Sequence, residues 1–175
     1  VVGGGPAGLS AAWFLVEKGH SVTVYDAEAE AGGALRYLIP EFRLPRQVLE
    51  RELQPLWDAG VRFVGSSRFG DEITPTDLLQ AGFDALVVST GGRQAVVPAP
   101  TTAGAEGVLD ARTLLRQVRE GSPVHLGDTV LVVGDGITAF DVARTALRLG
   151  AQRVVILAER GADEVPAGPA NVADA

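Results

Sequence analysis

Apolar and polar residues alternate between strand-like and helix-like spacing along the chain. At the start, Val1 and Val2 form an apolar run, residues 9–18 have helical spacing, and residues 21–25 alternate as a strand does before Asp26. A strand, a helix and a second strand in this order are typical of a βαβ unit with parallel strands. The pattern therefore predicts an α/β fold already at the amino terminus.

The first half of the chain continues with further elements. Prolines interrupt residues 36–45, which predicts an ordered loop there. A helix is predicted over residues 46–59, where Pro55 should kink or split it. The remaining predicted elements are a strand over 61–64, a short helix opened by Thr74, Pro75 and Asp77 and ending at Gln80, and a buried parallel strand over 84–88.

The second half repeats the opening pattern. Residues 129–133 are predicted as a strand, residues 140–149 as a helix and residues 154–157 as another strand. Ahead of this repeat, residues 94–107 form a connection of low charge, and residues 111–120 carry apolar side chains at helical spacing.

A glycine-rich turn joins the first strand to the first helix. Its spacing, Gly-x-Gly-x-x-Gly, binds dinucleotides when a strand precedes it and a helix follows. The glycines permit a tight turn, a close approach of backbone to a pyrophosphate, and close packing of helix on strand. The helix N-terminus favours phosphate, and an acid after the second strand can accept hydrogen bonds from ribose hydroxyls. We therefore predict a nucleotide site formed by Gly3, Gly4, Gly5, Pro6, Ala7, Gly8 and Asp26.

The same motif recurs in the second half. Gly134 and Gly136 stand at one constant offset from Gly3 and Gly5. Ala139 takes the place of the third glycine, a variant that the motif allows. Two such units in one chain predict that the protein brings two dinucleotides together.

Composition narrows the classes of function. The chain has 175 residues, a formal net charge of −7 and 46% hydrophobic residues, which suits a soluble globular protein. The negative charge argues against nucleic acid or an anionic membrane as partner, and no apolar run reaches membrane-spanning length. Cysteine is absent, so thiol catalysis and cysteine metal sites are excluded within these residues. We expect a cytoplasmic location, no metal site and no catalytic side chain, because in hydride transfer the cofactor carries the reaction.

Further sequence blocks are more specific than the glycine turns. They are Gly32-Gly33, Leu35-Arg36-Tyr37, residues 39–45 and Ser89-Thr90-Gly91, and they accompany residues 3–8 and 134–150. With these blocks the chain resembles, nearly end to end, the small (β) subunit of glutamate synthase. It also resembles related FAD- and NADPH-dependent oxidoreductases, including the flavin-binding region of dihydropyrimidine dehydrogenase.

The resemblance implies that the first unit binds FAD and the second binds NADPH. It implies further FAD contacts from the backbone of Gly33 and Ala34, the Arg43 side chain, and the loop at Thr90 and Gly91. In the second unit it implies nucleotide contacts from Gly134, Gly136, Ile137, Thr138 and Arg160. Any iron–sulfur clusters would belong to a segment outside this one.

Two positions of the second unit depart from the family pattern. Ile137 stands where the family usually has Asn. Glu159 stands where the family usually has the first of two arginines for the 2′-phosphate of NADPH, so only Arg160 remains. A carboxylate repels a phosphate and suits a free ribose hydroxyl. Two expectations stay open: that the second nucleotide is NADH rather than NADPH, or that this site has lost its function.

Together these features predict a flavoprotein oxidoreductase that passes a hydride from NAD(P)H to FAD and electrons on to a partner domain or subunit. One alternative is a one-site FAD oxidase or monooxygenase whose second unit is only structural. Another is a flavin-binding interaction domain without catalysis. The role of Arg36 also stays open between a cofactor contact and an ion pair with Glu41.

The predicted organisation has three parts. Residues 1–100 form the first part of an FAD-binding unit, residues 101–126 a connecting segment with a helix, and residues 127–175 the N-terminal part of an NAD(P)-binding unit. The tail, residues 161–175, is rich in small residues and closes no predicted unit. We expect a fragment of a longer protein, with Rossmann-like doubly wound parallel sheets of which the second is incomplete.

Overall fold

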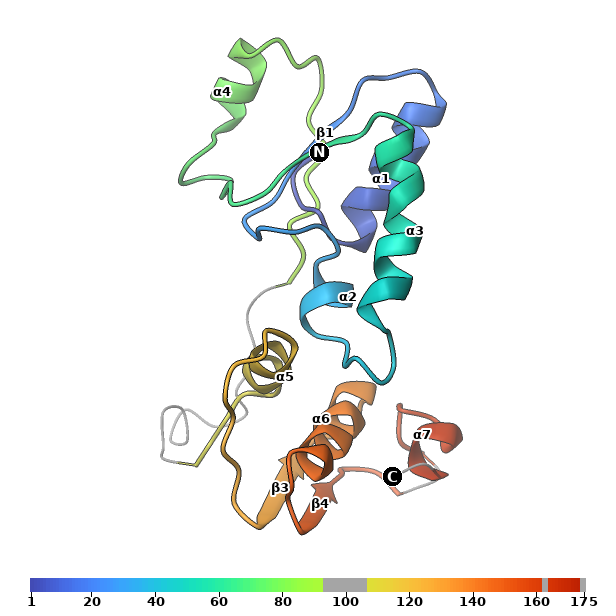
Figure 1. Cartoon of the computed structure of the whole chain (residues 1–175), viewed down its shortest axis with the longest axis vertical. Coiled ribbons are helices and arrows are strands. Elements are labelled where there is room, and N and C mark those ends of the chain that lie inside the picture. The colour runs from blue at the N-terminus through green and yellow to red at the C-terminus, as the bar shows by residue number, and fades with distance from the viewer. Residues whose placement is uncertain (93–106, 162–163, 174–175) are drawn as a thin grey trace. The chain divides into compact units, whose positions relative to one another are not determined.

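The computed structural model describes residues 1–92, 107–161 and 164–173. The chain divides into two compact units, residues 1–93 and 94–175. Each unit contains a pair of parallel strands with helices packed on them, and Figure 1 shows the pair of the second unit, β3 (Thr129–Val133) and β4 (Arg153–Leu157), beside α6 (Ile137–Arg148). The predicted α/β class is therefore confirmed. The connection predicted over residues 94–107 lies outside the described residues except for Gly107, as does the unit boundary expected at residue 100.

The first unit contains a short parallel sheet with helices. Its elements are α1 (Pro6–Glu17), β1 (Thr23–Tyr25), α2 (Ala34–Tyr37), α3 (Arg46–Asp58), β2 (Arg62–Val64) and α4 (Pro75–Gln80). Strands β1 and β2 pair in parallel, with Val24 opposite Phe63. Val2 extends the sheet, because it forms one parallel bridge to Tyr25 and another to Val88.

The order across this sheet is β2, β1, Val2 and Val88, which is third, second, first and fourth along the chain. A doubly wound sheet with this order reverses its direction between the first and fourth positions. Ligands of such sheets bind beyond the carboxyl ends of the strands at that reversal. Here the residues that follow Val2 and Val88 are Gly3 and Ser89.

The core of the first unit lies between α1, α3 and the sheet. Helices α1 and α3 lie side by side (Figure 1). Leucines at helical spacing on α3 face inward, and Trp13 and Trp57 are half-buried against the same cluster. The buried members of the cluster are Leu9, Ala12, Val22, Val24, Ala31, Leu49, Leu53, Leu56 and Val61.

Several element bounds differ from the sequence prediction. Helix α1 begins at Pro6, three residues early, because Gly5 acts as its N-cap and proline fits the first helical position. Arg36 and Tyr37, the first two residues of the predicted loop 36–45, belong instead to the short helix α2. Helix α3 continues past Pro55 without splitting, because a proline in the last turn removes only one helical hydrogen bond. The capped helix at Thr74 is confirmed, with a complete capping box to Asp77.

The buried strand predicted over residues 84–88 is wrong. Within the described residues this segment forms only the bridge from Val88 to Val2. Val88 is 58% exposed and Val87 is 37% exposed. A short apolar run identifies a strand that could be buried on both faces of a parallel sheet. It does not determine whether other segments cover those two faces.

The second unit has the same βαβ order. Its elements are α5 (Ala111–Arg119), β3 (Thr129–Val133), α6 (Ile137–Arg148), β4 (Arg153–Leu157) and α7 (Pro169–Ala173). Strands β3 and β4 are parallel, with Leu131 opposite Val155. Helix α6 begins three residues earlier than predicted because Gly136 is its N-cap, just as Gly5 is for α1.

Segments before β3 and after β4 pack on α6. On one side, Leu114 and Leu115 of α5 join a buried cluster with Val142. On the other side, the tail is packed where none of its structure was expected. Val165 and Ala167 are buried against Phe140. Arg144 of α6 donates hydrogen bonds to Asn171 Oδ1 at 3.1 Å and to its backbone oxygen at 3.0 Å.

Candidate nucleotide-binding site

The first glycine turn is held by contacts that leave no room for larger residues. Gly3 has φ +106°, and a Cβ there would clash with the Ser89 carbonyl oxygen. A Cβ on Gly8 would clash with the Gly3 carbonyl oxygen. Gly8 therefore permits the close packing of α1 on the strand end, as the motif predicts, and Gly3 permits the close approach of Ser89 to the turn.

Gly5 differs from Gly3 and Gly8, because its surroundings are open. Among the described residues, a Cβ on Gly5 would meet only Gly33 Cα, at 3.9 Å. Gly5 is also the N-cap of α1, and no side chain caps that helix. In contrast, Thr74 caps α4 and Asp110 caps α5 through their side chains. An uncapped helix N-terminus beside open backbone fits a pyrophosphate group.

Asp26 lies directly against the turn. Its Oδ2 accepts a hydrogen bond from Gly4 N at 2.5 Å, and its Oδ1 accepts one from Glu28 N at 2.7 Å. The residue is 9% exposed. The carboxylate predicted to meet a ribose therefore also fixes the glycine turn to the end of β1.

A second glycine turn approaches the first one. Gly32 N donates a hydrogen bond to Gly4 O at 2.8 Å. A Cβ on Gly33 would lie 2.7 Å from Gly5 Cα, so only glycine permits this approach. Ala34 follows as the first residue of α2 and is exposed. The structure thus brings the predicted Gly33–Ala34 backbone next to the predicted phosphate turn.

Ser89 connects the fourth sheet position to the same turn. Its Oγ donates to Val2 O at 3.0 Å and to Gly3 O at 3.3 Å, and its N–H donates to Val2 O at 2.7 Å. Thr90 and Gly91 follow as exposed residues beyond the strand end. The sequence analysis included Ser89 in the block with Thr90 and Gly91 but expected FAD contacts only from Thr90 and Gly91, so the bond from Ser89 to the glycine turn was not predicted.

Arg43 is a predicted FAD contact that does not belong to the hydrogen bonds and close approaches described above. Its side chain is exposed on the loop after α2, and its N–H donates to Pro40 O at 2.9 Å. A role for Arg43 toward FAD therefore stays a prediction that rests on the family resemblance.

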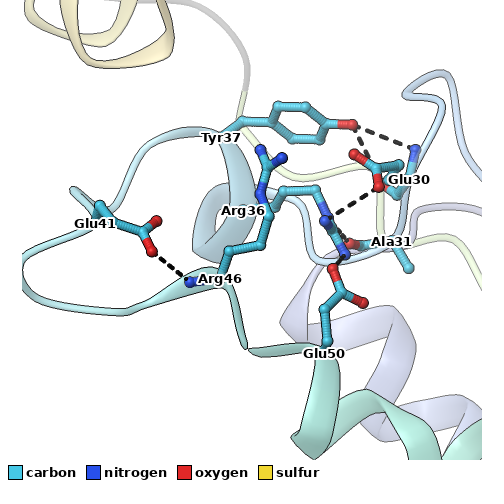
Figure 2. A network of polar contacts seen from close by, with 7 residues as sticks. All are labelled: Glu30, Ala31, Arg36, Tyr37, Glu41, Arg46 and Glu50. Carbon is cyan, nitrogen blue, oxygen red and sulfur yellow. Dashed lines mark hydrogen bonds and ion pairs between the residues drawn. The ribbon is translucent and has the colours of Figure 1, made fainter. Parts of the chain in front are cut away.

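Arg36 lies inside the protein and has acidic partners (Figure 2). Its side chain pairs with Glu30 at 3.3 Å and with Glu50 at 2.6 Å. Glu41, the partner considered from sequence, accepts a hydrogen bond from Arg46 N at 2.9 Å. Burial raises the pKa of the neighbouring Tyr37 above its ordinary value, and the Tyr37 hydroxyl accepts a hydrogen bond from Glu30 N at 3.3 Å.

The second unit has an equivalent turn. Gly134 has φ +135°, and a Cβ on Gly136 would meet nothing within 4 Å. Ile137 is 47% exposed at the first position of α6, and the next residue, Thr138, is exposed as well. No side chain caps α6, so this helix N-terminus is as suited to a phosphate as that of α1.

The arginine predicted for the coenzyme has a partner in that turn. Arg160 Nη1 lies 3.4 Å from Asp135 Oδ2. Asp135 stands between the two glycines of the motif, and sequence reasoning did not select it. A carboxylate inside a phosphate-binding motif was a visible signal, but its pairing across to the end of β4 follows only from the fold.

Two features of the described residues bear on the type of site. No group of three or more His, Cys, Asp or Glu side chains there is arranged to hold a metal ion. No helix in that part of the chain is long and apolar enough to cross a membrane.

The chain belongs to a known family of enzymes. A family model described as pyridine nucleotide-disulphide oxidoreductase matches residues 1–167. This match covers both glycine turns and both parallel strand pairs. The sequence contains no cysteine, so the disulphide of the family's description has no counterpart within these residues.

Curated relatives confirm the resemblance drawn from the sequence blocks. The chain is 36% identical over 184 residues to a putative glutamate synthase [NADPH] small chain of Cereibacter sphaeroides, covering 100% of this chain and 44% of that protein. It is 35% identical over 176 residues to the NAD-dependent dihydropyrimidine dehydrogenase subunit PreT of Escherichia coli O157:H7, covering 100% of this chain and 42% of that protein. The chain thus spans less than half the length of these relatives.

A solved structure supports the fold. FprA, a Mycobacterium tuberculosis oxidoreductase, matches with a TM-score of 0.77 at 20% identity, over 94% of this chain and 44% of that protein. At this identity the likeness concerns the fold alone, and it agrees with the Rossmann-like α/β class predicted from the sequence.

Proposed function

We propose that this chain is the nucleotide-binding part of a flavoprotein oxidoreductase similar to the small chain of glutamate synthase. The whole protein would pass a hydride from NAD(P)H to FAD and send electrons to a partner domain or subunit. FAD, when bound, supplies the redox chemistry, so the side chains of this chain serve binding and orientation.

One observation carries the proposal. The open, uncapped turn at Gly5 lies beyond the reversal of a parallel sheet, where Ser89 also stands. This is the place at which doubly wound sheets bind nucleotides. A second uncapped glycine turn, at Gly136, opens an equivalent βαβ unit in the same chain.

The first unit would supply part of the FAD site. We assign the pyrophosphate to the backbone turn of residues 3–7, in which Pro6 has no N–H to donate and the N–H groups of Gly3 and Gly4 donate to Tyr25 O and Asp26. We assign the adenosine ribose to Asp26. The backbone at Gly33 and Ala34, the Arg43 side chain, and the loop of Thr90 and Gly91 would make further contacts. Gly4 and Gly8 would act indirectly, since they let Asp26 and α1 lie close to the turn.

The second unit would hold the nicotinamide coenzyme. We assign its pyrophosphate to the turn at Gly134, Gly136, Ile137 and Thr138, and its adenosine end to Arg160. The two relatives differ in coenzyme, since the name of one contains NADPH and that of the other NAD. Because Arg160 stands beside Glu159 and pairs with Asp135, we propose that NADH is accepted at least as well as NADPH.

The names of the relatives also bear on partners. One is called a small chain and the other a subunit, which supports an electron-accepting partner for the protein that contains this chain. We propose the cytoplasm as its location, in keeping with a cysteine-free sequence of this class.

A second candidate function rests on one observation. If Asp135 and Arg160 form an ion pair that is only structural, the second unit binds no coenzyme. The protein would then be a one-site FAD oxidase or monooxygenase, or a flavin-binding domain without catalysis.

The experiment is an anaerobic titration of the full-length protein. The flavin is first released and identified, and the holoprotein is then mixed with NADH or NADPH. The proposed function predicts released FAD and bleaching of the flavin absorbance by at least one coenzyme. Retained FAD without bleaching would support the one-site candidates. A protein without FAD would contradict the proposed function and the one-site candidates alike, because both place FAD in the first unit.

A further inference from the structure

Arg36 is a charged side chain almost fully inside the first unit. It is 2% exposed. A buried guanidinium is stable only when acceptors meet its N–H groups. Its Nε donates to Ala31 O at 2.5 Å, its Nη1 donates to Glu30 Oε1 at 3.3 Å, and its Nη2 pairs with Glu50 Oε1 at 2.6 Å (Figure 2).

These contacts join three segments of the chain. Glu30 and Ala31 belong to the loop after β1, Arg36 belongs to α2, and Glu50 belongs to α3. The two carboxylates are about half exposed, at 55% and 49%, while the guanidinium between them is enclosed. A planar group with five donors can meet acceptors in three directions, whereas a lysine ammonium cannot reproduce that fork.

The Arg36 contact to Ala31 closes a small loop around the second glycine turn. Gly32 and Gly33 lie between these two residues, and a Cβ on Gly32 would lie 3.0 Å from Arg36 Cβ. Gly33 has φ 52° and ψ −127°, a conformation that other residues rarely adopt. Such a backbone persists only where its surroundings hold it.

On its other side this loop touches the phosphate turn. Gly32 donates its N–H to Gly4 O at 2.8 Å, and the backbone of Gly33 lies against Gly5. Arg36 itself does not need to reach a ligand to influence the site. Its closure of the loop sets where the Gly33 backbone stands relative to Gly5.

We infer that Arg36 is a positioning residue of the FAD site, which acts by holding the backbone of Gly33 against Gly5. The inference rests on the proposed function, because it takes the turn at Gly5 as the FAD pyrophosphate site. Glu50 completes the arrangement by fixing the guanidinium to α3, and Tyr37 supports the same loop through Glu30.

The test measures FAD affinity in the full-length protein. The apoprotein of each variant is titrated with FAD, and the quenching of flavin fluorescence gives the dissociation constant. Arg36→Met keeps the apolar stem and removes the donors, and we expect at least about tenfold weaker FAD binding. Glu50→Gln and Arg36→Lys keep part of the contacts and should fall between Arg36→Met and wild type.

Arg51→Met is the matched control. Arg51 lies on α3 next to Glu50, is 74% exposed, and pairs only at the surface with Glu52. Its removal should change FAD affinity by less than about twofold, because exposed ion pairs contribute little.

A double-mutant cycle separates positioning from general stability. Gly33→Ala pushes a Cβ toward Gly5 Cα and should weaken FAD binding through the same backbone. If Arg36 acts through Gly33, the effects of Arg36→Met and Gly33→Ala on FAD affinity are less than additive. If Arg36→Met weakened FAD binding only by lowering the overall stability of the protein, its effect on FAD affinity would add to that of Gly33→Ala.

The outcomes are distinct. Unchanged FAD affinity in Arg36→Met, or additive effects in the cycle, overturns the inference and leaves the proposed function standing. A wild-type protein that binds no FAD overturns both. If Arg36→Met fails to fold, Glu50→Gln decides: wild-type affinity in that variant contradicts the inference, and weakened affinity with native unfolding behaviour supports it.

Discussion

Asp135 follows the first strand of the second βαβ unit and Arg160 follows its second strand, and their side chains form an ion pair of 3.4 Å. Asp135 is the residue between the two glycines of the second turn, and Arg160 follows β4. The cation that we assign to the coenzyme is thus already paired with a carboxylate of the turn that we assign to its pyrophosphate.

Asp135→Asn should therefore release Arg160 and remove a negative charge from the turn. We expect tighter binding of both coenzymes, with the larger gain for NADPH, by about fivefold, which is on the order of one exposed ion pair. Dissociation constants from anaerobic flavin reduction measure this. Asp128→Asn makes the same charge change at an exposed position before β3 and should leave the preference unchanged. Equal effects of the two variants would show that Asp135 does not face the coenzyme.

Glu159→Arg restores the pair of arginines that the family usually has. A 2′-phosphate carries close to two negative charges, so a second guanidinium should shift the preference toward NADPH by about tenfold or more. The same titration with NADH and NADPH, in wild type and variant, gives this ratio. A wild type already strongly selective for NADPH and unchanged by the substitution would place Glu159 away from the adenosine.

The βαβ units and their glycine turns could be predicted from sequence because they depend on local rules. Glycine spacing, helical period and strand alternation determined α1, α6 and the strand pairs to within a few residues. Gly5 and Gly136 even have nearly the same backbone angles, φ −82° and −83°, as a repeated motif requires.

The missed features all depend on contacts between distant segments. The Arg36 partners Glu30 and Glu50 lie on opposite sides of it in sequence, and no periodicity connects them. Asp135 meets Arg160 only after α6 has brought the two strand ends to one edge. The exposure of Val88 was missed because an apolar run shows what a segment would bury but not what lies beside it.

Gly5 and Gly8 should respond differently to the same substitution. A Cβ on Gly8 would clash with Gly3 O, so Gly8→Val should destabilise the fold by several kcal/mol, at the upper end of single substitutions. Gly5 has open surroundings, so Gly5→Val should keep native far-UV circular dichroism while the flavin absorbance of the full-length protein is lost.

Chemical denaturation and flavin content, measured on both variants, check this contrast. Full FAD content in Gly5→Val would remove the turn from the proposed site. A Gly8→Val protein as stable as wild type would show that α1 does not pack as closely on Gly3 as described.

The central claim is that two glycine turns of one chain serve two different nucleotides, and single-turnover flavin reduction in Gly136→Val tests it most directly. A Cβ at Gly136 would meet no atom of the described residues within 4 Å, so this variant should fold normally and keep its FAD. Gly127→Val, in the turn before β3, is the control, because its added Cβ would have only Thr129 O nearby, at 3.9 Å. We predict that anaerobic NADH or NADPH bleaches the flavin in wild type and Gly127→Val but at least about a hundredfold more slowly in Gly136→Val at equal coenzyme concentration, in line with a phosphate contact blocked by a side chain. Reduction of Gly136→Val at the wild-type rate would contradict a coenzyme site in the second unit.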